Sequence, residues 1–121
     1  MIEFRDVTKS YGNNCIALEN FNLTVSDGEF VFVVGPSGSG KSTFLKLLTK
    51  EEEPTSGNIF INSVNLSKMK KRQIPYLRRT MGIVFQDFRV IEKMTVFENV
   101  AFGMHVVGAK ARDIRKRVPY V

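Results

Sequence analysis

The order of three segments predicts an α/β fold. Residues 30–34 form a continuous run of aromatic and β-branched side chains, which is typical of a strand buried on both faces of a sheet. A loop rich in glycine follows directly over residues 35–40. Residues 41–49 then carry apolar side chains at helical spacing. A strand, a glycine loop and a helix in this order begin an α/β unit.

Alternating and β-branched segments predict further strands on either side of this unit. Before it, we expect strands over residues 2–9, 15–18 and 21–25, with turns at Asn13-Asn14, Asn20 and Asp27-Gly28. After it, we expect a loop and turn over residues 51–57 and short strands over residues 58–61 and 81–85.

Helices are predicted in the remainder of the chain. A short helix follows Pro75. Thr95 precedes Glu98 by three residues, which is the pattern of a capping box, and we expect a helix over residues 95–107 that stops at Gly108. Its apolar positions at intervals of four are Val96, Val100 and Met104.

A last helix is expected from Lys110. Its apolar positions, spaced i, i+4 and i+7, are Ile114, Val118 and Val121. Pro119 removes one backbone hydrogen bond from this pattern. The chain ends before the pattern does, so we expect Ile114 and Val118 to lack a full core and to be exposed or covered by another chain.

Composition limits the class of protein. The 121 residues carry a net charge of +6, of which residues 101–121 contribute +4, with five basic and one acidic side chain. No apolar run approaches the roughly 20 residues of a membrane span, and no secretory signal is visible. One cysteine and one histidine cannot form a disulfide or a Cys/His metal cluster within the chain. A cytosolic protein is the default expectation.

The glycine loop matches the phosphate-binding pattern G-x-x-x-x-G-K-[ST] at every defined position. Backbone N–H groups wrap a polyphosphate, so small residues are needed, and the helix that follows points its positive end at the same oxygens. Lys41 supplies a charge to the β- and γ-phosphates, Ser42 a hydroxyl to Mg²⁺, and Thr43 a hydroxyl near the α-phosphate. The candidate phosphate-binding residues are Gly35, Pro36, Ser37, Gly38, Ser39, Gly40, Lys41, Ser42 and Thr43.

Two residues, one on each side of the glycine loop, indicate which kind of phosphate-binding-loop protein this is. Tyr11 precedes Lys41 by 30 residues, and Gln86 follows it by 45. With the glycine loop at this spacing, the chain resembles the nucleotide-binding subunits of ATP-binding cassette (ABC) proteins over essentially its whole length. The resemblance implies that Tyr11 stacks on adenine, that Gln86 approaches Mg²⁺ and the attacking water, and that the cofactors are ATP and Mg. It assigns Lys41 and Gln86 to catalysis, and Ser42 and Gln86 to the metal.

The resemblance also implies an architecture and partners. We expect an N-terminal antiparallel β-subdomain and the start of a mixed-sheet core over residues 1–94, and the start of a helical subdomain over residues 95–121. Residues 79–89 and 95–102 look most like the cell-division subunits of the family, which implies a role in activating cell-wall hydrolases. The implied partners are an integral membrane subunit and a second copy, at the inner face of the membrane. Candidate docking residues after Gln86 are Phe88, Val90, Ile91 and Met94.

The sequence lacks parts that the family uses for hydrolysis. A complete subunit is nearly twice as long, so we expect a truncated domain without the L-S-G-G-type motif, the strand ending in Asp-Glu and the late switch histidine. The only consecutive acids, residues 51–53, fit a solvated loop and not a catalytic carboxylate. Phosphoryl transfer to water needs such a carboxylate, so we expect ATP binding without turnover by these 121 residues, and ATPase activity in the full-length parent.

Three alternatives stay open from the sequence. The chain could belong to an ABC transporter for lipoprotein or macrolide export or for amino-acid import. It could be another P-loop GTPase or kinase, although no Asn-Lys-x-Asp motif is present. A nucleic-acid-binding module is disfavoured because no aromatic residues interleave with the basic ones, which could face anionic lipid or solvent instead. These basic residues are Lys68, Lys70, Lys71, Arg72, Arg78 and Arg79.

Overall fold

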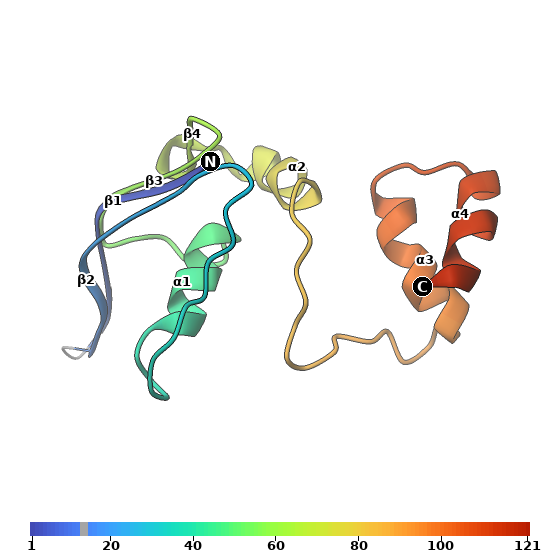
Figure 1. The fold of residues 1–121 in the computed structure, drawn as a ribbon, viewed down its shortest axis with the longest axis horizontal. Coiled ribbons are helices and arrows are strands. Elements are labelled where there is room, and N and C mark those ends of the chain that lie inside the picture. The colour runs from blue at the N-terminus through green and yellow to red at the C-terminus, as the bar shows by residue number, and fades with distance from the viewer. Residues whose placement is uncertain (13–14) are drawn as a thin grey trace. The chain divides into compact units, whose positions relative to one another are not determined.

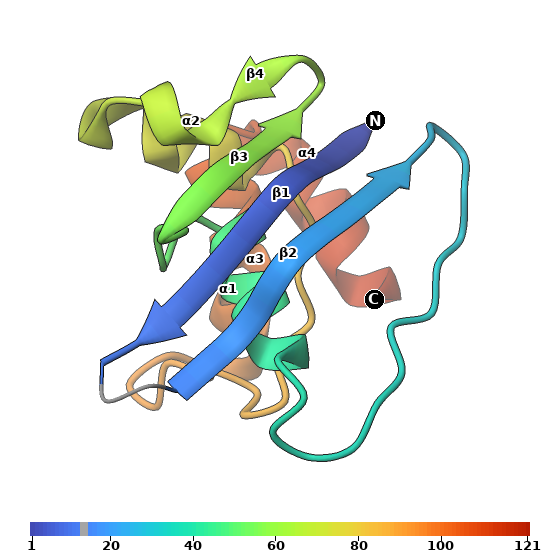
Figure 2. The ribbon, with the colours of Figure 1, turned by 90° about the vertical axis from the view of Figure 1, so that its left-hand side faces the viewer.

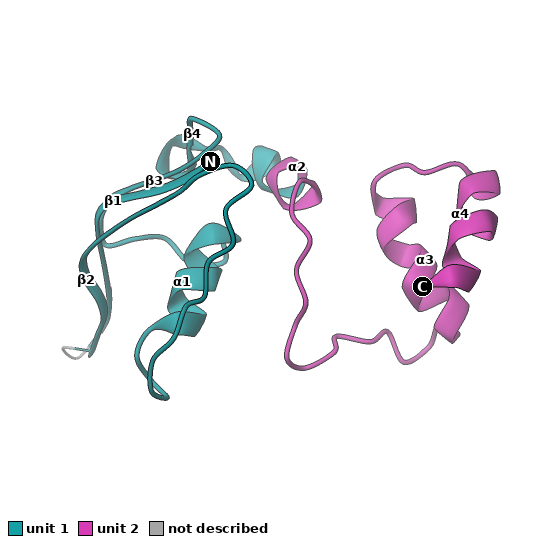
Figure 3. Cartoon of the chain, in the orientation of Figure 1, with its two compact units in different colours: residues 1–75 teal, residues 76–121 magenta. Residues whose placement is uncertain are grey.

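The computed structural model describes residues 1–12 and 15–121. The turn predicted at Asn13-Asn14 lies outside the described residues. The chain forms two compact units, Met1–Pro75 and Tyr76–Val121, which are coloured separately in Figure 3. The subdomain boundary expected after residue 94 remains a prediction.

The first unit contains a four-stranded antiparallel sheet (Figures 1 and 2). Its strands lie in the order β2-β1-β3-β4. Their bounds are Ile2–Tyr11 for β1, Cys15–Val25 for β2, Ser56–Ile61 for β3 and Val64–Asn65 for β4. The expected N-terminal antiparallel sheet is therefore confirmed, and β4 is an addition that the sequence pattern did not predict.

Strand β2 is continuous where a turn was predicted at Asn20, so that prediction was wrong. Asn20 has a positive φ of 43°. The residue lies within a stretch of irregular pairing between β1 and β2. Its backbone N–H donates to the Thr8 side-chain oxygen at 3.1 Å. Asparagine tolerates this left-handed conformation, and here it forms part of a bulge instead of reversing the chain. The turn predicted at Asp27-Gly28 is confirmed.

Helix α1 (Lys41–Leu48) packs on one face of this sheet (Figure 1). The Phe44 ring stacks on the Phe4 ring of β1 with centroids 4.9 Å apart, and the Phe21 ring of β2 meets Phe44 edge-on at 6.0 Å. Burial of these large rings supplies much of the apolar driving force of the unit. The helix predicted over residues 41–49 is confirmed, and its first turn is fixed to the sheet.

Two predicted strands are not formed. Residues 30–34 and 81–85 belong to no strand, and Phe30 and Phe32 are 81% and 79% exposed. The apolar runs are there, but a strand also needs neighbours that pair with its N–H and C=O groups. Among the described residues, no strand pairs with either segment. The expectation of a buried central strand before the glycine loop is corrected accordingly.

Short helices connect the sheet to the second unit. They are the 3₁₀ turns η1 (Leu66–Lys68) and η2 (Lys71–Gln73), followed by α2 (Ile74–Arg79). The helix predicted to follow Pro75 thus begins one residue before it, at Ile74, because proline is well tolerated in the first turn of a helix.

The second unit has its own small core. Helices α3 (Val96–Val106) and α4 (Ala111–Arg117), with the 3₁₀ turn η3 (Val118–Tyr120), bury Ala101, Ile114 and Val118 together. The expected exposure of Ile114 and Val118 was wrong, because they pack on Ala101 and on partly buried Met104. The face of α3 that is buried therefore centres on Ala101, while Val96 and Val100 are exposed. Among the described residues, no helix has the length and apolar character needed to cross a membrane.

The capping box predicted at the start of α3 is confirmed. The Thr95 side-chain oxygen accepts from the Glu98 backbone N–H at 3.2 Å, and the Thr95 backbone N–H and hydroxyl donate to the Glu98 carboxylate at 2.7 and 2.8 Å. These two donated bonds hold the pKa of Glu98 below its ordinary value of 4.5. A lowered pKa means that the ionised form stabilises the fold.

The capping box makes helix stability depend on pH. Its contribution is present at pH values above the ordinary carboxyl pKa and is lost as the pH falls through the lowered pKa of Glu98. We expect Glu98→Gln to lower the melting temperature by a few degrees at pH 7 and to have little effect at pH 2, measured by circular dichroism. Glu92→Gln, at an exposed position outside the capping box, is the matched control. Equal pH dependence in wild type and Glu98→Gln would contradict this account.

Candidate phosphate-binding site

The glycine loop enters α1 through a backbone position that only glycine fits. Gly40 is the N-cap of α1 and has a φ of 89°, in the left-handed region. A Cβ atom at Gly40 would lie 2.3 Å from the Ala17 carbonyl oxygen of β2. The backbone of the loop therefore approaches the sheet more closely than any side chain allows, and the start of α1 is held there.

The loop also closes on itself over a short distance. A Cβ atom at Gly35 would lie 2.6 Å from the Ser39 Oγ. The Ser39 backbone N–H donates to the Pro36 carbonyl at 3.3 Å, with Ser37 and Gly38 at the turn between them. A tight loop of small residues leaves its backbone open to close approach by a phosphate group.

Lys41 places its charge at this loop. The Lys41 ammonium donates to the carbonyl oxygens of Gly35 and Pro36, each at 2.6 Å, and lies 3.4 Å from the Ser39 Oγ. The first turn of α1 carries no acidic side chain, and its N-cap makes no side-chain hydrogen bond. The ammonium charge and the positive end of the helix are thus at the same end of α1, which suits an anion.

The hydroxyls after Lys41 differ in accessibility. Ser42 is exposed, whereas Thr43 is buried. An exposed hydroxyl next to a phosphate loop fits a ligand of Mg²⁺, which prefers oxygen and keeps several waters. The loop backbone, Lys41 and Ser42 therefore fit a polyphosphate with its metal.

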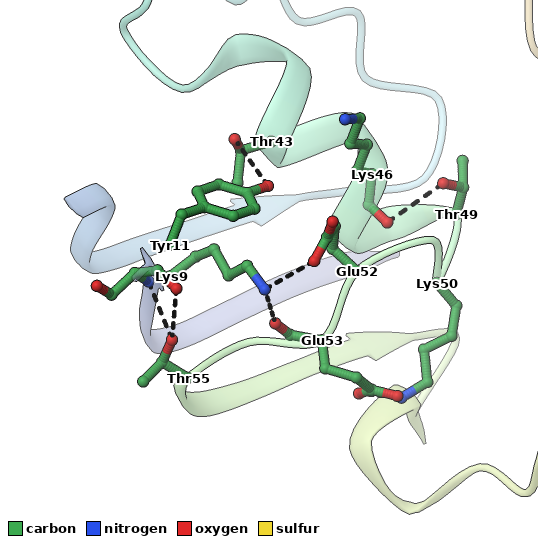
Figure 4. Close-up of polar contacts among 10 residues, drawn as sticks. Lys9, Tyr11, Thr43, Lys46, Thr49, Lys50, Glu52, Glu53 and Thr55 are labelled. Atoms are coloured by element: carbon green, nitrogen blue, oxygen red, sulfur yellow. Dashed lines mark hydrogen bonds and ion pairs between the residues drawn. The ribbon is translucent and has the colours of Figure 1, made fainter. Parts of the chain in front are cut away.

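Tyr11 lies beside helix α1, which follows the glycine loop. Its hydroxyl is 3.4 Å from the Thr43 Oγ1 (Figure 4). The residue ends β1, and the packing of α1 on the sheet brings it to the first turn of the helix although 30 residues separate it from Lys41. Two of the predicted site elements are thus adjacent in the first unit.

A lysine that sequence reasoning missed lies next to Tyr11. The Lys9 ammonium lies over the Tyr11 ring, 4.8 Å from its centroid, and donates to the Glu52 carboxylate at 2.8 Å and to the Glu53 carbonyl at 2.9 Å (Figure 4). The Lys9 hydrogen bond is the main cause that holds the pKa of Glu52 below its ordinary value. The spacing of Lys9 and Tyr11, two residues apart on one strand, was the available signal.

The acidic run lies in a solvated loop, as predicted: Glu51 and Glu53 are exposed and Glu52 is half-buried. The sequence did not predict that two of these acids form ion pairs. Glu52 pairs with Lys9, and Glu53 pairs with Lys50, whose side chain is buried. The run follows the end of α1, where Lys50 has a φ of 57° and the Glu51 backbone N–H donates to the Lys46 carbonyl at 2.9 Å. This is a Schellman-type end with lysine at the position usually taken by glycine, and it turns the acids back toward β1.

Gln86 belongs to the second unit and is exposed. It precedes a tight segment in which Phe88 and Arg89 have φ values of 55° and 44°, and the Arg89 guanidinium lies 3.9 Å from the Phe85 ring centroid. Its predicted roles at Mg²⁺ and the attacking water stay predictions. Among the described residues, no cluster of histidine, cysteine and acidic side chains could hold a metal.

The segment after Gln86 presents apolar side chains to solvent. Phe88, Val90, Ile91 and Met94 are all exposed. Asn99 of α3, which the sequence reasoning missed, holds the end of this segment. Its side-chain amide accepts from the Ile91 N–H at 2.8 Å and donates to the carbonyls of Ile91, Met94 and Thr95 at 3.0–3.1 Å. The available signal was an asparagine near the start of a predicted helix, where its side chain can bond to the backbone of the preceding loop.

The basic residues considered for nucleic acid or lipid are all exposed. They are Lys68, Lys70, Lys71, Arg72, Arg78 and Arg79, on or next to η1, η2 and α2. Arg79 lies over the Tyr76 ring, 5.2 Å from its centroid.

Comparison with known proteins shows the family. A family model described as ABC transporter matches residues 18–120. The chain is 52% identical over 118 residues to the cell division ATP-binding protein FtsE of Bacillus subtilis, which covers 98% of this chain and 52% of that protein. It is 45% identical over 122 residues to FtsE of Mycobacterium tuberculosis, covering 100% and 53%. It is also 45% identical over 121 residues to the methionine import ATP-binding protein MetN 1 of Shouchella clausii, covering 98% and 35%.

A solved structure gives the same answer for the fold. The chain is 35% identical, with a TM-score of 0.88, to an ATP-binding cassette solved as a dimer in a post-hydrolysis state bound to ADP and Pi. The match covers 98% of this chain and 54% of that one. The chain thus spans about half the length of the FtsE relatives and of this cassette. The predicted fold class is confirmed, and the chain belongs to the ABC transporter family.

Proposed function

We propose that the chain binds Mg·ATP at the glycine loop. The main support is the position of the Lys41 ammonium, which donates to the carbonyls of Gly35 and Pro36. It lies at the positive end of α1, whose first turn has no acidic side chain. The backbone N–H groups of the loop residues other than Pro36, which has none, and the Lys41 ammonium hold the phosphates, and Ser42 faces the metal. Bound Mg²⁺ supplies charge neutralisation at the phosphate oxygens. Thr43 lies near the α-phosphate, and Tyr11 stacks on the base.

The parent protein is proposed to be an ATPase, whereas these 121 residues do not turn ATP over alone. Gln86 would help to orient water, but hydrolysis also needs a carboxylate to polarise it. The acids after α1 are not proposed to supply one: Glu52 and Glu53 are paired with Lys9 and Lys50, and Glu51 accepts a hydrogen bond from the Thr49 hydroxyl. The second face of the nucleotide would come from another copy of the subunit.

The cell-division role rests on the relatives named FtsE. We propose an FtsE-like subunit at the inner face of the cell membrane that acts with an FtsX-like membrane subunit and couples ATP to the activation of cell-wall hydrolases. The exposed apolar residues after Gln86 are the proposed docking site. The match to a methionine import subunit supports a second candidate, an amino-acid importer of the same family.

The first test is nucleotide affinity. Removing the Lys41 charge should weaken Mg·ATP binding by roughly 10–100-fold, because a charge-assisted hydrogen bond to phosphate is lost. Titration of a fluorescent ATP analogue against wild type, Lys41→Ala and the control Lys46→Ala measures this. Lys46 is exposed on the same helix, away from the loop, and its loss should change affinity little.

Competition in the same titration separates the nucleotide classes. We expect unlabelled ATP to displace the analogue better than GTP. A clear preference for GTP would defeat the ATP assignment, and unchanged affinity in Lys41→Ala would defeat the proposed site.

The second test is turnover. We expect phosphate release from Mg·ATP by the wild-type chain to equal that of Lys41→Ala, which sets the background of the assay. Release above this background that disappears with Lys41→Ala would show that the chain hydrolyses ATP unaided and would overturn the proposed inactivity.

The third test concerns the docking site. Val90 and Val107 are exposed to similar extents, 62% and 59%, in the same unit. We expect Val90→Asp to reduce co-sedimentation of the chain with vesicles that carry the FtsX-type membrane subunit of Bacillus subtilis, because a charge in an apolar contact must be desolvated. Val107→Asp should co-sediment like wild type. Equal behaviour of the two variants would place docking elsewhere.

A further inference from the structure

A partly buried lysine, Lys9, contacts the Tyr11 ring and two groups of the loop after α1. The Lys9 side chain is only 12% exposed, although lysine is rarely buried without a partner. Its ammonium lies 2.8 Å from the Glu52 carboxylate and 2.9 Å from the Glu53 carbonyl, so its charge is compensated. Its third neighbour is the face of the Tyr11 ring, 4.8 Å from the ammonium to the centroid.

The Tyr11 side chain has a neighbour at its ring and another at its hydroxyl. Lys9 covers one face of the ring, and the hydroxyl lies 3.4 Å from the Thr43 Oγ1 at the first turn of α1. An aromatic ring has two faces, and a purine stacks on one of them. Because the ammonium occupies one face, a base that stacks on Tyr11 has to use the opposite face, and a ring with a fixed neighbour loses less freedom when the base binds.

We propose that Lys9 is a positioning residue for nucleotide binding, which holds Tyr11 for stacking and leaves one ring face to the base. Lys9 itself does not touch the nucleotide in this account. The loop after α1 contributes through Glu52 and the Glu53 carbonyl, which fix the ammonium over the ring. This inference rests on the proposed binding of ATP. It extends the proposed site to the loop after α1, which carries Glu52 and Glu53.

The test separates the base from the phosphates. Inorganic tripolyphosphate offers the glycine loop its phosphates without a base, so the ratio of its Kd to the Kd of ATP measures what the adenosine part contributes. We expect Lys9→Met to lower this ratio about two- to fivefold, as loss of a cation–π contact and of ring order implies, with the Kd of tripolyphosphate nearly unchanged. Both ligands are measured as Mg²⁺ complexes by isothermal titration calorimetry.

Two further variants distinguish positioning from a general structural role. Lys9→Arg keeps a cation that stacks well on tyrosine, and it should restore the ratio. Lys50→Met removes the ion pair to Glu53 in the same loop, so it should lower the melting temperature but leave the ratio unchanged. If Lys50→Met lowers the ratio as much as Lys9→Met does, the effect belongs to the loop and the proposal is overturned.

A double-mutant cycle tests whether Lys9 acts through the ring. Tyr11→Leu removes the stacking surface and should lower the ratio by itself. In that background, Lys9→Met should have no further effect, because the two changes act on one interaction. A further drop would overturn the proposal, as would an unchanged ratio in Lys9→Met alone. If Lys9→Met does not fold, Lys9→Gln, which keeps a neutral donor to Glu52, carries the same test.

The outcomes also separate this inference from the proposed function. A wild-type chain that binds neither Mg·ATP nor Mg·tripolyphosphate overturns both. A wild-type chain that binds Mg·ATP, loses it with Lys41→Ala, and shows the same ratio with and without Lys9 retains the proposed function and overturns the role of Lys9.

Discussion

The packing of α1 on the sheet determines where the proposed nucleotide-binding residues of the first unit lie. Phe44 stacks on Phe4 and meets Phe21 edge-on, which fixes the axis of the helix against β1 and β2. At the start of α1, Gly40 approaches the Ala17 carbonyl so closely that a Cβ atom would collide with it. The apolar contact and the close backbone approach together determine where the positive end of the helix and the Lys41 charge lie. A bulkier residue at Gly40 would push the loop away from the sheet.

The other end of the same helix is tied to the sheet by charge. Lys50 adopts the left-handed conformation that glycine usually takes at a helix end, and the chain then turns back toward β1. The carboxylates of Glu52 and Glu53 are bound to Lys9 and Lys50, and Glu51 accepts a hydrogen bond from the Thr49 hydroxyl at 3.2 Å. Because Lys9 also covers Tyr11, the same ion pairs connect the end of α1 to the residue proposed to stack on the base.

Local patterns were good predictors where the deciding interaction is local. The capping box of Thr95 and Glu98, the stop at Gly108 and the start of α1 after the glycine loop depend on residues within one or two turns, and the structure confirms them. Strand prediction failed where pairing decides. Residues 30–34 have the composition of a buried strand, yet no described strand pairs with them. A pattern of apolar residues along the chain cannot specify which segment pairs with it, because strand pairing joins residues that are far apart in sequence.

The sequence by itself determined the family, the phosphate-binding loop and the candidate residues Lys41, Ser42, Tyr11 and Gln86, because each depends on residue type and spacing along the chain. Only the tertiary structure decided which of these meet. It brought Tyr11 to Thr43, placed Lys9 over the Tyr11 ring and paired Glu52 and Glu53 with lysines. It also buried Ile114 and Val118 against Ala101, which the helical pattern alone did not foresee. The physical reason is that contacts across a sheet or between helices join residues that are tens of positions apart, and no local pattern specifies them.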